Sequence, residues 1–199
     1  EKEVFVVESV ATDLVYNMIQ EGAFLLNESQ LEKIMNLVLT YDETPKGREY
    51  HTSKNWVGKD AGKMLDAIGV QGKSDCRLLI CEVGPDHPFV LLEQLMPALP
   101  IVKCRNLDEA IKYAMIAEHG NRHTASMFSQ NINNLTRFAR EVETTIFVKN
   151  GATLAGVGFG GEGHTTMTIA GPTGEGITNA VSFTRQRRCA LSEGGFRII

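Results

Sequence analysis

The sequence lacks two features that would place it among nucleic-acid-binding or membrane proteins: an excess of positive charge and a long hydrophobic run. Its 24 acidic residues outnumber its 20 basic residues, which gives a net charge of −4 and a pI near 5.8. Nucleic-acid-binding domains usually present a basic face, so we expect no nucleic-acid partner. No apolar stretch approaches the length of a membrane span and no signal peptide is recognisable, so we expect no membrane partner and a cytoplasmic location.

Metal-ligand spacing is also missing. The four cysteines (Cys76, Cys81, Cys104 and Cys189) lie in apolar or strand-like runs without the spacing of a zinc site, and the histidines complete no such pattern. We therefore expect reduced thiols and no metal. The sequence has no initiator methionine and enters an apolar run directly after Glu1, so we expect a piece of a longer protein.

What the sequence does contain is an alternation of strand and helix patterns in an ordinary globular composition, with 43% hydrophobic and 22% charged residues. Hydrophobic periodicity and capping residues predict strands over 4–7, 77–83, 100–104, 123–128 and 144–148, and helices over 10–20, 60–68, 106–118 and 132–140. A further helix is predicted to start at the cap-like residues 27–30 and to continue to Val38. This order predicts parallel βαβ units in an α/β fold. The polar stretch 41–54, which contains Pro45 and Gly47, predicts a loop.

Nine of the nineteen glycines fall between Gly151 and Gly176. Gly158 to Gly163 satisfies the G-x-G-x-x-G pattern, but that pattern indicates dinucleotide binding only where a helix follows it. The threonine-rich residues 164–169 predict a strand instead. Gly171 to Thr178 resembles a phosphate-binding loop except that Ile177 stands at the lysine position. We interpret the tract as a set of tight turns.

The end of the sequence alternates polar and apolar residues. From Phe183 to Leu191 this pattern predicts an exposed edge strand, and an edge strand requires a partner. We therefore expect a homo-oligomer that forms through Phe183 to Leu191.

In their order along the chain, several short motifs resemble the C-terminal, catalytic-domain half of the coenzyme-A-acylating aldehyde dehydrogenases of bacterial microcompartments, which act on acetaldehyde or propionaldehyde. Each motif alone is weak, but the ordered set is specific and covers nearly the whole chain. The motifs are Trp56 to Lys63, His87 to Phe89, Glu93 to Pro100, His123 to Ala125, Ile146 to Gly151, Gly158 to Gly163, Pro172 to Gly176, Arg187 to Cys189 and Phe196 to Ile198.

The resemblance implies a three-layer α/β catalytic domain with a mostly parallel sheet over 1–180, and a C-terminal strand and tail for subunit contact over 181–199. It implies an enzyme that uses NAD and coenzyme A to oxidise a short-chain aldehyde to an acyl-CoA through a cysteine thioester. In the family the nucleophilic cysteine lies just upstream of the segment that matches Glu1, and the dinucleotide-binding domain precedes it. We therefore expect no catalytic residue in this chain and an inactive isolated segment. A bacterial microcompartment is a further location that the resemblance suggests.

The resemblance also implies two groups of site residues. Glu93 and Leu95 match a glutamate and an aromatic residue that contact the nicotinamide ribose, and a carboxylate can accept hydrogen bonds from ribose hydroxyls. Leu95 departs from the aromatic residue of the family. Asn150, Gly151, Ala152, Thr153 and Leu154 match the loop that lines the aldehyde tunnel, where small residues leave room for a short aldehyde.

Two other functions stay open at the level of sequence. The first is a segment of a hydrolytic aldehyde dehydrogenase, against which the Trp56 segment and the motifs around Lys149 and Pro172 favour the acylating type. The second is a non-catalytic module for assembly or nucleotide binding. A cysteine encoded a few positions upstream of Glu1 would favour the enzyme, and an initiator methionine there would favour the module.

Overall fold

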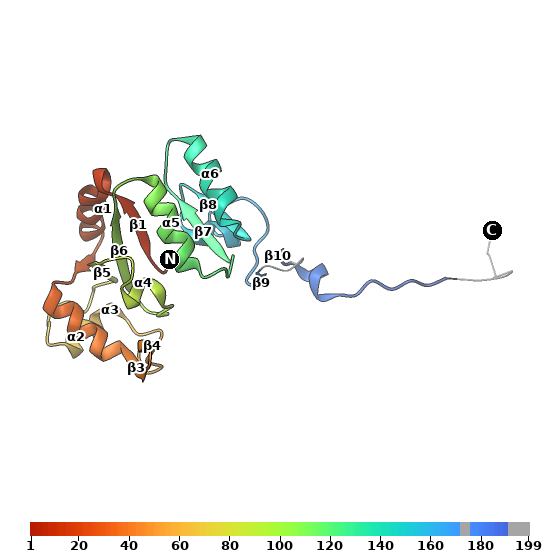
Figure 1. Cartoon of the computed structure of the whole chain (residues 1–199). Helices are drawn as coiled ribbons and strands as arrows, with labels where there is room; N and C mark the ends of the chain where they lie inside the picture. The colour runs from red at the N-terminus through yellow and green to blue at the C-terminus, as the bar shows by residue number, and fades with distance from the viewer. Residues whose placement is uncertain (172–175, 191–199) are drawn as a thin grey trace. The chain divides into compact units, whose positions relative to one another are not determined.

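A computed structural model describes residues 1–171 and 176–190 of the chain (Figure 1). It divides into two compact units, Glu1–Gly120 and Asn121–Ile199. The first is called unit 1 and the second unit 2. The boundary expected between residues 180 and 181 stays a prediction.

Unit 1 is built on a four-stranded sheet in which every neighbouring pair is parallel, in the strand order β1-β6-β5-β2. The strands are β1 (Val4–Val7), β2 (Ala23–Leu25), β5 (Leu78–Glu82) and β6 (Ala98–Cys104). The predictions of a strand near each of β1, β5 and β6, and of parallel pairing, are confirmed. Strand β2 is an addition that its three-residue length hid from the periodicity.

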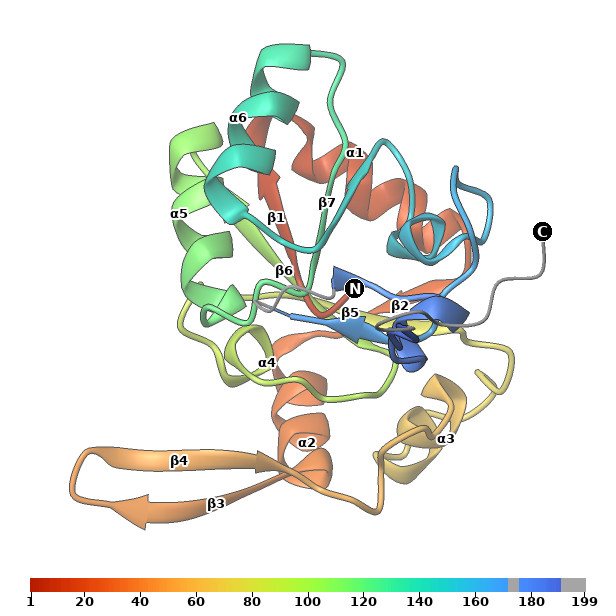
Figure 2. The same ribbon diagram turned by 90° about the vertical axis from the view of Figure 1, so that its right-hand side faces the viewer.

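Helices cover both faces of this sheet, which makes three layers (Figure 2). The helices are α1 (Glu8–Gln20), α2 (Glu28–Val38), α3 (Ala61–Ala67), α4 (Pro88–Leu91) and α5 (Leu107–Glu118). Successive residues of β6 point to opposite faces: Leu99 and Ile101 pack with α1, whereas Ala98 packs in the cluster that holds α2, α3 and α4. Val102 packs in a third cluster, with residues of α4 and α5. The predicted three-layer α/β fold is confirmed.

Asparagine caps start the helices where the sequence predicts them. Asn27 accepts a hydrogen bond from the backbone N–H of Gln30 at 2.9 Å, and the Gln30 side chain accepts one from the Asn27 N–H at 3.0 Å, which is a capping box. Asn106 caps α5 through the N–H of Glu109 at 3.0 Å. These bonds satisfy N–H groups that the first helical turn leaves without partners.

The loop predicted over 41–54 is wrong, because most of it forms an antiparallel hairpin of β3 (Leu39–Thr44) and β4 (Gly47–Thr52). The connection turns at Gly47, which has a φ of +111°. Most side chains of the hairpin are exposed, so its sequence lacks the apolar alternation that reveals a half-buried strand. Cross-strand contacts support it instead, including the Tyr41 and Tyr50 rings at 5.8 Å.

Unit 2 contains a parallel pair of strands, β7 (Thr124–Met127) and β8 (Ile146–Lys149), joined by α6 (Ile132–Val142). All three elements were predicted. Helix α6 begins at the cap residue Asn131, and its Phe138 ring meets Phe147 of β8 edge-on at 5.6 Å. The remaining elements of the unit are η1 (Thr153–Val157), β9 (Ile169–Ala170), β10 (Gly176–Ile177) and η2 (Ala180–Phe183).

One predicted strand of unit 2 is wrong, and a second does not form within the single chain. Of the strand expected over 164–169, only Ile169 pairs with another strand. The Thr166 hydroxyl donates instead to the Thr168 carbonyl at 3.2 Å, and a local bond of this kind competes with strand pairing. Residues Ala180–Phe183 form a 3₁₀ turn capped by Asn179, and residues 184–190 are exposed and form neither helix nor strand. Leu191, the last residue of that expected strand, lies outside the described residues. Across 1–171 and 176–190, no helix is long and apolar enough to span a membrane.

Candidate functional site

Glu93 and Leu95 lie on the connection between α4 and β6 in unit 1. Three hydrogen bonds fix this segment, called the 92–97 loop. The Thr52 hydroxyl donates to the Glu93 carbonyl at 3.1 Å, the Gly58 N–H donates to the Leu95 carbonyl at 3.0 Å, and the Gln94 amide donates to the Phe89 carbonyl. Anchored in this way, the loop has a defined shape although it belongs to no helix or strand.

The side chains of the 92–97 loop alternate between outside and inside. Gln94 is only 3% exposed, whereas its two neighbours, Glu93 and Leu95, are exposed. The Glu93 carboxylate has no hydrogen-bond or ion-pair partner among the described residues, so all its acceptor positions face solvent. The arrangement presents a carboxylate and an apolar side chain on the same short segment.

Leu95 has a φ of +56°, in the left-handed region that a branched side chain rarely adopts. It is also 60% exposed, so burial of its side chain does not stabilise this conformation. A strained residue persists only where its surroundings hold it. Here the surroundings are the bonds made by Gln94 and Gly58 on either side of the Leu95 backbone.

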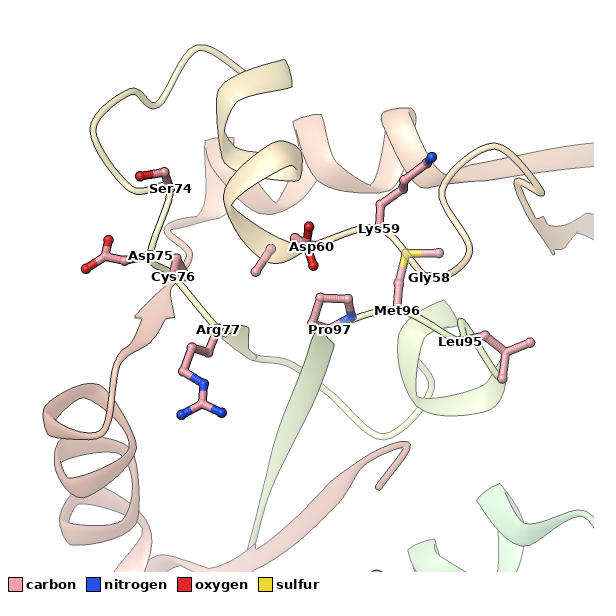
Figure 3. Close-up of a pocket in the computed structure, with 11 residues that line it drawn as sticks. Gly58, Lys59, Asp60, Ser74, Asp75, Cys76, Arg77, Leu95, Met96 and Pro97 are labelled. Carbon is pink, nitrogen blue, oxygen red and sulfur yellow. The ribbon is translucent and has the colours of Figure 1, made fainter. Parts of the chain in front are cut away.

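Leu95 lines the rim of an open pocket of about 620 Å³ (Figure 3). Asp60 stands between the Ser74–Arg77 side of the pocket and the Gly58–Leu95 side in this view. The pocket carries charges of both signs, and the Asp60 carboxylate lies 3.5 Å from the Lys63 ammonium. The lining residues are Gly58, Lys59, Asp60, Ala61, Ser74, Asp75, Cys76, Arg77, Leu95, Met96 and Pro97.

The second group of predicted site residues follows β8 in unit 2. Asn150 has a φ of +52°, and its side-chain oxygen accepts a hydrogen bond from the Ser129 N–H at 2.7 Å. Gly151 packs closely, since an added Cβ would lie 3.3 Å from Val148 Cγ1. Ala152 is exposed, half-buried Thr153 begins η1, and Leu154 is 61% exposed. The segment is therefore a rigid turn that presents small and apolar side chains.

Several glycines after this turn lie in close packing. An added Cβ at Gly156 would overlap Ile146 Cγ2. The N–H groups of Gly158 and Phe159 donate to the carbonyls of Ala155 and Leu154 at 3.2 and 3.1 Å, so these donors are not free to hold an anion. Residues 164–169, which follow Gly163 directly, form no helix, as predicted, and the interpretation as tight turns fits this segment. Residues 172–175 of the second glycine pattern lie outside the described residues.

The cysteines differ in environment. Burial raises the pKa of Cys81 to about 12 and that of Cys104 to about 11, with the carboxylate of Glu109 adding to the second shift. A thiol with so high a pKa supplies very little thiolate near neutral pH. Cys76 is half-buried and Cys189 is exposed, and all four thiols are free.

The whole chain aligns with known aldehyde dehydrogenases, although no protein-family model matches it. Acetaldehyde dehydrogenase (acetylating) EutE of Salmonella typhimurium is 46% identical over 200 residues, which cover 100% of this chain and 42% of the relative. The chain is homologous to a segment of the coenzyme-A-acylating aldehyde dehydrogenases. It spans about 42% of the length of the EutE relatives that it matches.

Solved structures of such enzymes share the fold. A propionaldehyde dehydrogenase from the fucose utilisation bacterial microcompartment of Clostridium phytofermentans is 42% identical with a TM-score of 0.85. The propionaldehyde dehydrogenase of Rhodopseudomonas palustris, with bound CoA and an acylated cysteine, is 43% identical with a TM-score of 0.86. Each match covers 96% of this chain and 42% of the other. The resemblance found in the sequence motifs is confirmed.

The structure thus collects Glu93 and Leu95 on one anchored loop and residues 150–154 on one anchored turn. Sequence reasoning missed the anchors of the first group, which are Thr52, Gly58 and Gln94. The available signal was Gln94 itself, a glutamine between Glu93 and Leu95 in a stretch that prolines bound on both sides. It was easy to miss because its partner, the Phe89 carbonyl, carries no sequence signature.

Proposed function

We propose that this chain forms the catalytic-domain segment of an NAD-dependent, coenzyme-A-acylating aldehyde dehydrogenase that acts on a short-chain aldehyde. The reaction converts an aldehyde, NAD⁺ and the thiol of coenzyme A into an acyl-CoA, NADH and a proton. The observation that carries the proposal is the anchored 92–97 loop, which presents Glu93 at the position that matches the cofactor-contacting glutamate of the family. The acylating relatives that align over the whole chain support it.

The residues of the 92–97 loop fit the ribose of a dinucleotide. Glu93 offers a carboxylate with no hydrogen-bond or ion-pair partner among residues 1–171 and 176–190, and it can accept hydrogen bonds from ribose hydroxyls. Leu95 offers an exposed apolar side chain against which a flat ring can pack. When bound, NAD supplies the acceptor for the hydride of the substrate. The role of Glu93 and Leu95 is to orient the cofactor.

Asn150 to Leu154 would line the path of the aldehyde. Gly151 and Ala152 add little side-chain volume, and Leu154 adds apolar surface, so the segment suits a short aldehyde. The bond from the Ser129 N–H to the Asn150 side chain fixes the turn before this segment. The bound CoA and acylated cysteine of the Rhodopseudomonas palustris enzyme support coenzyme A as the second substrate.

The nucleophile would come from outside this chain, so we propose that the isolated segment is inactive. Cys81 and Cys104 are buried thiols with raised pKa values, which are poor nucleophiles. Cys76 donates to the Leu78 carbonyl at 3.5 Å, and Cys189 stands on a segment without secondary structure. Among the described residues, no base is hydrogen-bonded to either thiol.

We also propose that copies of this protein assemble through residues 183–191. The described part of this segment, up to residue 190, is exposed and pairs with no strand among the described residues. An extended segment of this kind can complete a ladder on another subunit. The microcompartment origin of the Clostridium phytofermentans relative supports a location inside such a compartment.

The experiment that tests the function replaces the matching segment of Salmonella typhimurium EutE with this chain, so that the relative supplies the remainder of the enzyme. We expect NADH formation from acetaldehyde or propionaldehyde that requires coenzyme A. Glu93→Ala in the same chimaera should raise the KM for NAD, because it removes the ribose acceptor. The isolated chain is the control and should form no NADH.

Two other outcomes would reject the proposal in favour of its rivals. NADH formation without coenzyme A, with release of the free acid, would indicate a hydrolytic aldehyde dehydrogenase. A folded chimaera that forms no NADH with either aldehyde would leave the assembly or nucleotide-binding module as the better function.

A further inference from the structure

We infer that Gln94 is a positioning residue that holds Glu93 and Leu95 in the geometry needed to bind the cofactor. This inference rests on the proposed function, because it concerns the same site. It begins from the contrast within one tripeptide: the middle residue is buried and hydrogen-bonded, and its two neighbours are exposed.

The side chain of Gln94 joins two parts of unit 1. Its amide nitrogen donates to the carbonyl of Phe89, which lies in the four-residue helix α4 and has a completely buried side chain. So short a helix leaves carbonyls at its C-terminal end without intrahelical partners. The amide of Gln94 satisfies one of these carbonyls and ties the loop to the best-packed aromatic residue of the largest core cluster.

We infer that the hydrogen bonds to the carbonyls of Glu93 and Leu95 depend on the bond that the Gln94 amide makes. The Leu95 carbonyl accepts from Gly58 and the Glu93 carbonyl accepts from Thr52, so the loop is held to the last residue of β4 and to the segment that follows it. Between these two bonds Leu95 is held at a positive φ, which it would leave if the loop were free. Rotation of Leu95 to a negative φ would change the direction of its side chain relative to that of Glu93.

The buried amide therefore controls the ligand-facing side chains although it cannot reach the ligand itself. A carboxylate that must meet ribose hydroxyls tolerates little displacement, since hydrogen bonds weaken steeply with poor alignment. The loop positions Glu93 and Leu95 through Gln94, in the way that a supporting hydrogen bond orients a metal ligand.

The test uses Gln94→Met in the chimaera with EutE, because methionine keeps the length of the side chain and lacks the amide donor. NADH binding is measured by fluorescence titration, and KM and kcat are measured for NAD and for the aldehyde. We expect the dissociation constant for NADH and the KM for NAD to rise about tenfold, equivalent to about 1.4 kcal/mol, with kcat and the aldehyde KM almost unchanged. Gln20→Met, at an exposed glutamine that ends α1, is the matched control and should change none of these values.

A second readout needs no activity. The Gly58 N–H donates to the Leu95 carbonyl, so its hydrogen exchange in this chain reports the shape of the loop directly. Gln94→Met should speed exchange at Gly58 and leave the amides of β5 and β6 protected. If Gln94→Met does not fold, Thr52→Val removes another anchor from a half-buried position and should raise the NADH dissociation constant about threefold.

The outcomes separate the two proposals. Unchanged NADH affinity in folded Gln94→Met, together with weaker binding in Glu93→Ala, would overturn the positioning role and leave the proposed function intact. Unchanged NADH affinity in Glu93→Ala would instead reject the proposed cofactor site at Glu93. A rise in the aldehyde KM equal to that for NAD would also overturn the inference, because it would indicate a general structural defect.

Discussion

The two units of the chain bury their apolar residues to different extents. Unit 1 packs three clusters of buried side chains against the two faces of its four-stranded sheet. The described part of unit 2 has one pair of parallel strands, with α6 and η1 against it, and one short antiparallel pair, β9 and β10. Its described part leaves large apolar side chains more than half exposed, namely Phe128, Ile132, Leu154, Phe159, Met167, Val181 and Phe183.

This difference follows from the number of strands. A four-stranded parallel sheet offers enough area for helices on both faces, whereas two strands can bury only a few side chains on each face. The packed core of unit 1 can therefore hold a strained residue such as Leu95 in place. Unit 2 relies on tight turns and close glycine contacts around its strands, such as the contact of Gly156 with Ile146. Three changes would sharpen or break this comparison.

The largest effect is expected from Phe89→Ala in unit 1. Phe89 is completely buried in the largest core cluster, so its truncation should lower the free energy of unfolding by about 3–5 kcal/mol. Phe128→Ala in unit 2 is the matched control, since that ring is 71% exposed and its loss should cost less than about 0.5 kcal/mol. Urea unfolding followed by circular dichroism measures both. A similar loss in the two variants would mean that Phe128 is covered, and the comparison would be wrong.

A smaller effect is expected from Gly156→Ala in unit 2. The added methyl group would overlap Ile146 Cγ2 and lie near Val148, so the variant should lose about 1–3 kcal/mol of stability. Gly84→Ala in unit 1 is the control, because nothing lies within 4 Å of the added carbon and the cost should stay within about 0.5 kcal/mol. Thermal unfolding of both variants gives the values. If the two changes cost the same, close packing does not explain the glycines of unit 2.

The smallest effect concerns pH and belongs to unit 1 alone. Burial raises the pKa of Glu3, and Lys2, whose ammonium lies 3.4 Å from Glu3 Oε2, offsets part of this shift. Lys2 donates its hydrogen bonds to the carbonyls of Val90 and Ala117 at 2.8 and 2.9 Å, and Glu3 Oε2 accepts none from the described residues. The folded state thus favours the protonated form of this carboxyl more than the unfolded state does.

The sign of the pH dependence follows from the raised pKa. Stability from Glu3 is fully present below the pKa of about 4.5 in the unfolded chain and is lost as the pH rises through the higher folded pKa. Glu3→Gln should therefore raise the unfolding temperature at pH 7 and change it little at pH 3.5. We expect this shift only in the unfolding transition of unit 1. Differential scanning calorimetry measures it separately from the transition of unit 2. Lower stability of Glu3→Gln at pH 7 would show that the ion pair with Lys2 outweighs burial.

The sequence by itself determined the regular elements that repeat a local pattern. Apolar residues at helical spacing and the cap-like segments at Asn27 and Asn106 located the helices, and short apolar runs located β1, β5, β6 and β8. These signals work because a helix or a buried strand is selected by side chains only a few positions apart. The ordered motifs also sufficed to indicate the family, and they located Glu93 and residues 150–154 as candidate site residues.

Tertiary structure alone decided the hairpin of β3 and β4, the 3₁₀ turn at Ala180–Phe183 and the shape of the 92–97 loop. In the loop, Leu95 takes a positive φ that its residue type disfavours, because distant segments supply the compensating bonds from Gly58 and Thr52. A backbone carbonyl is present at every position, so no residue type announces that the Phe89 carbonyl will receive the Gln94 amide. Contacts of this kind depend on which segments the fold brings together, and local sequence does not encode that choice.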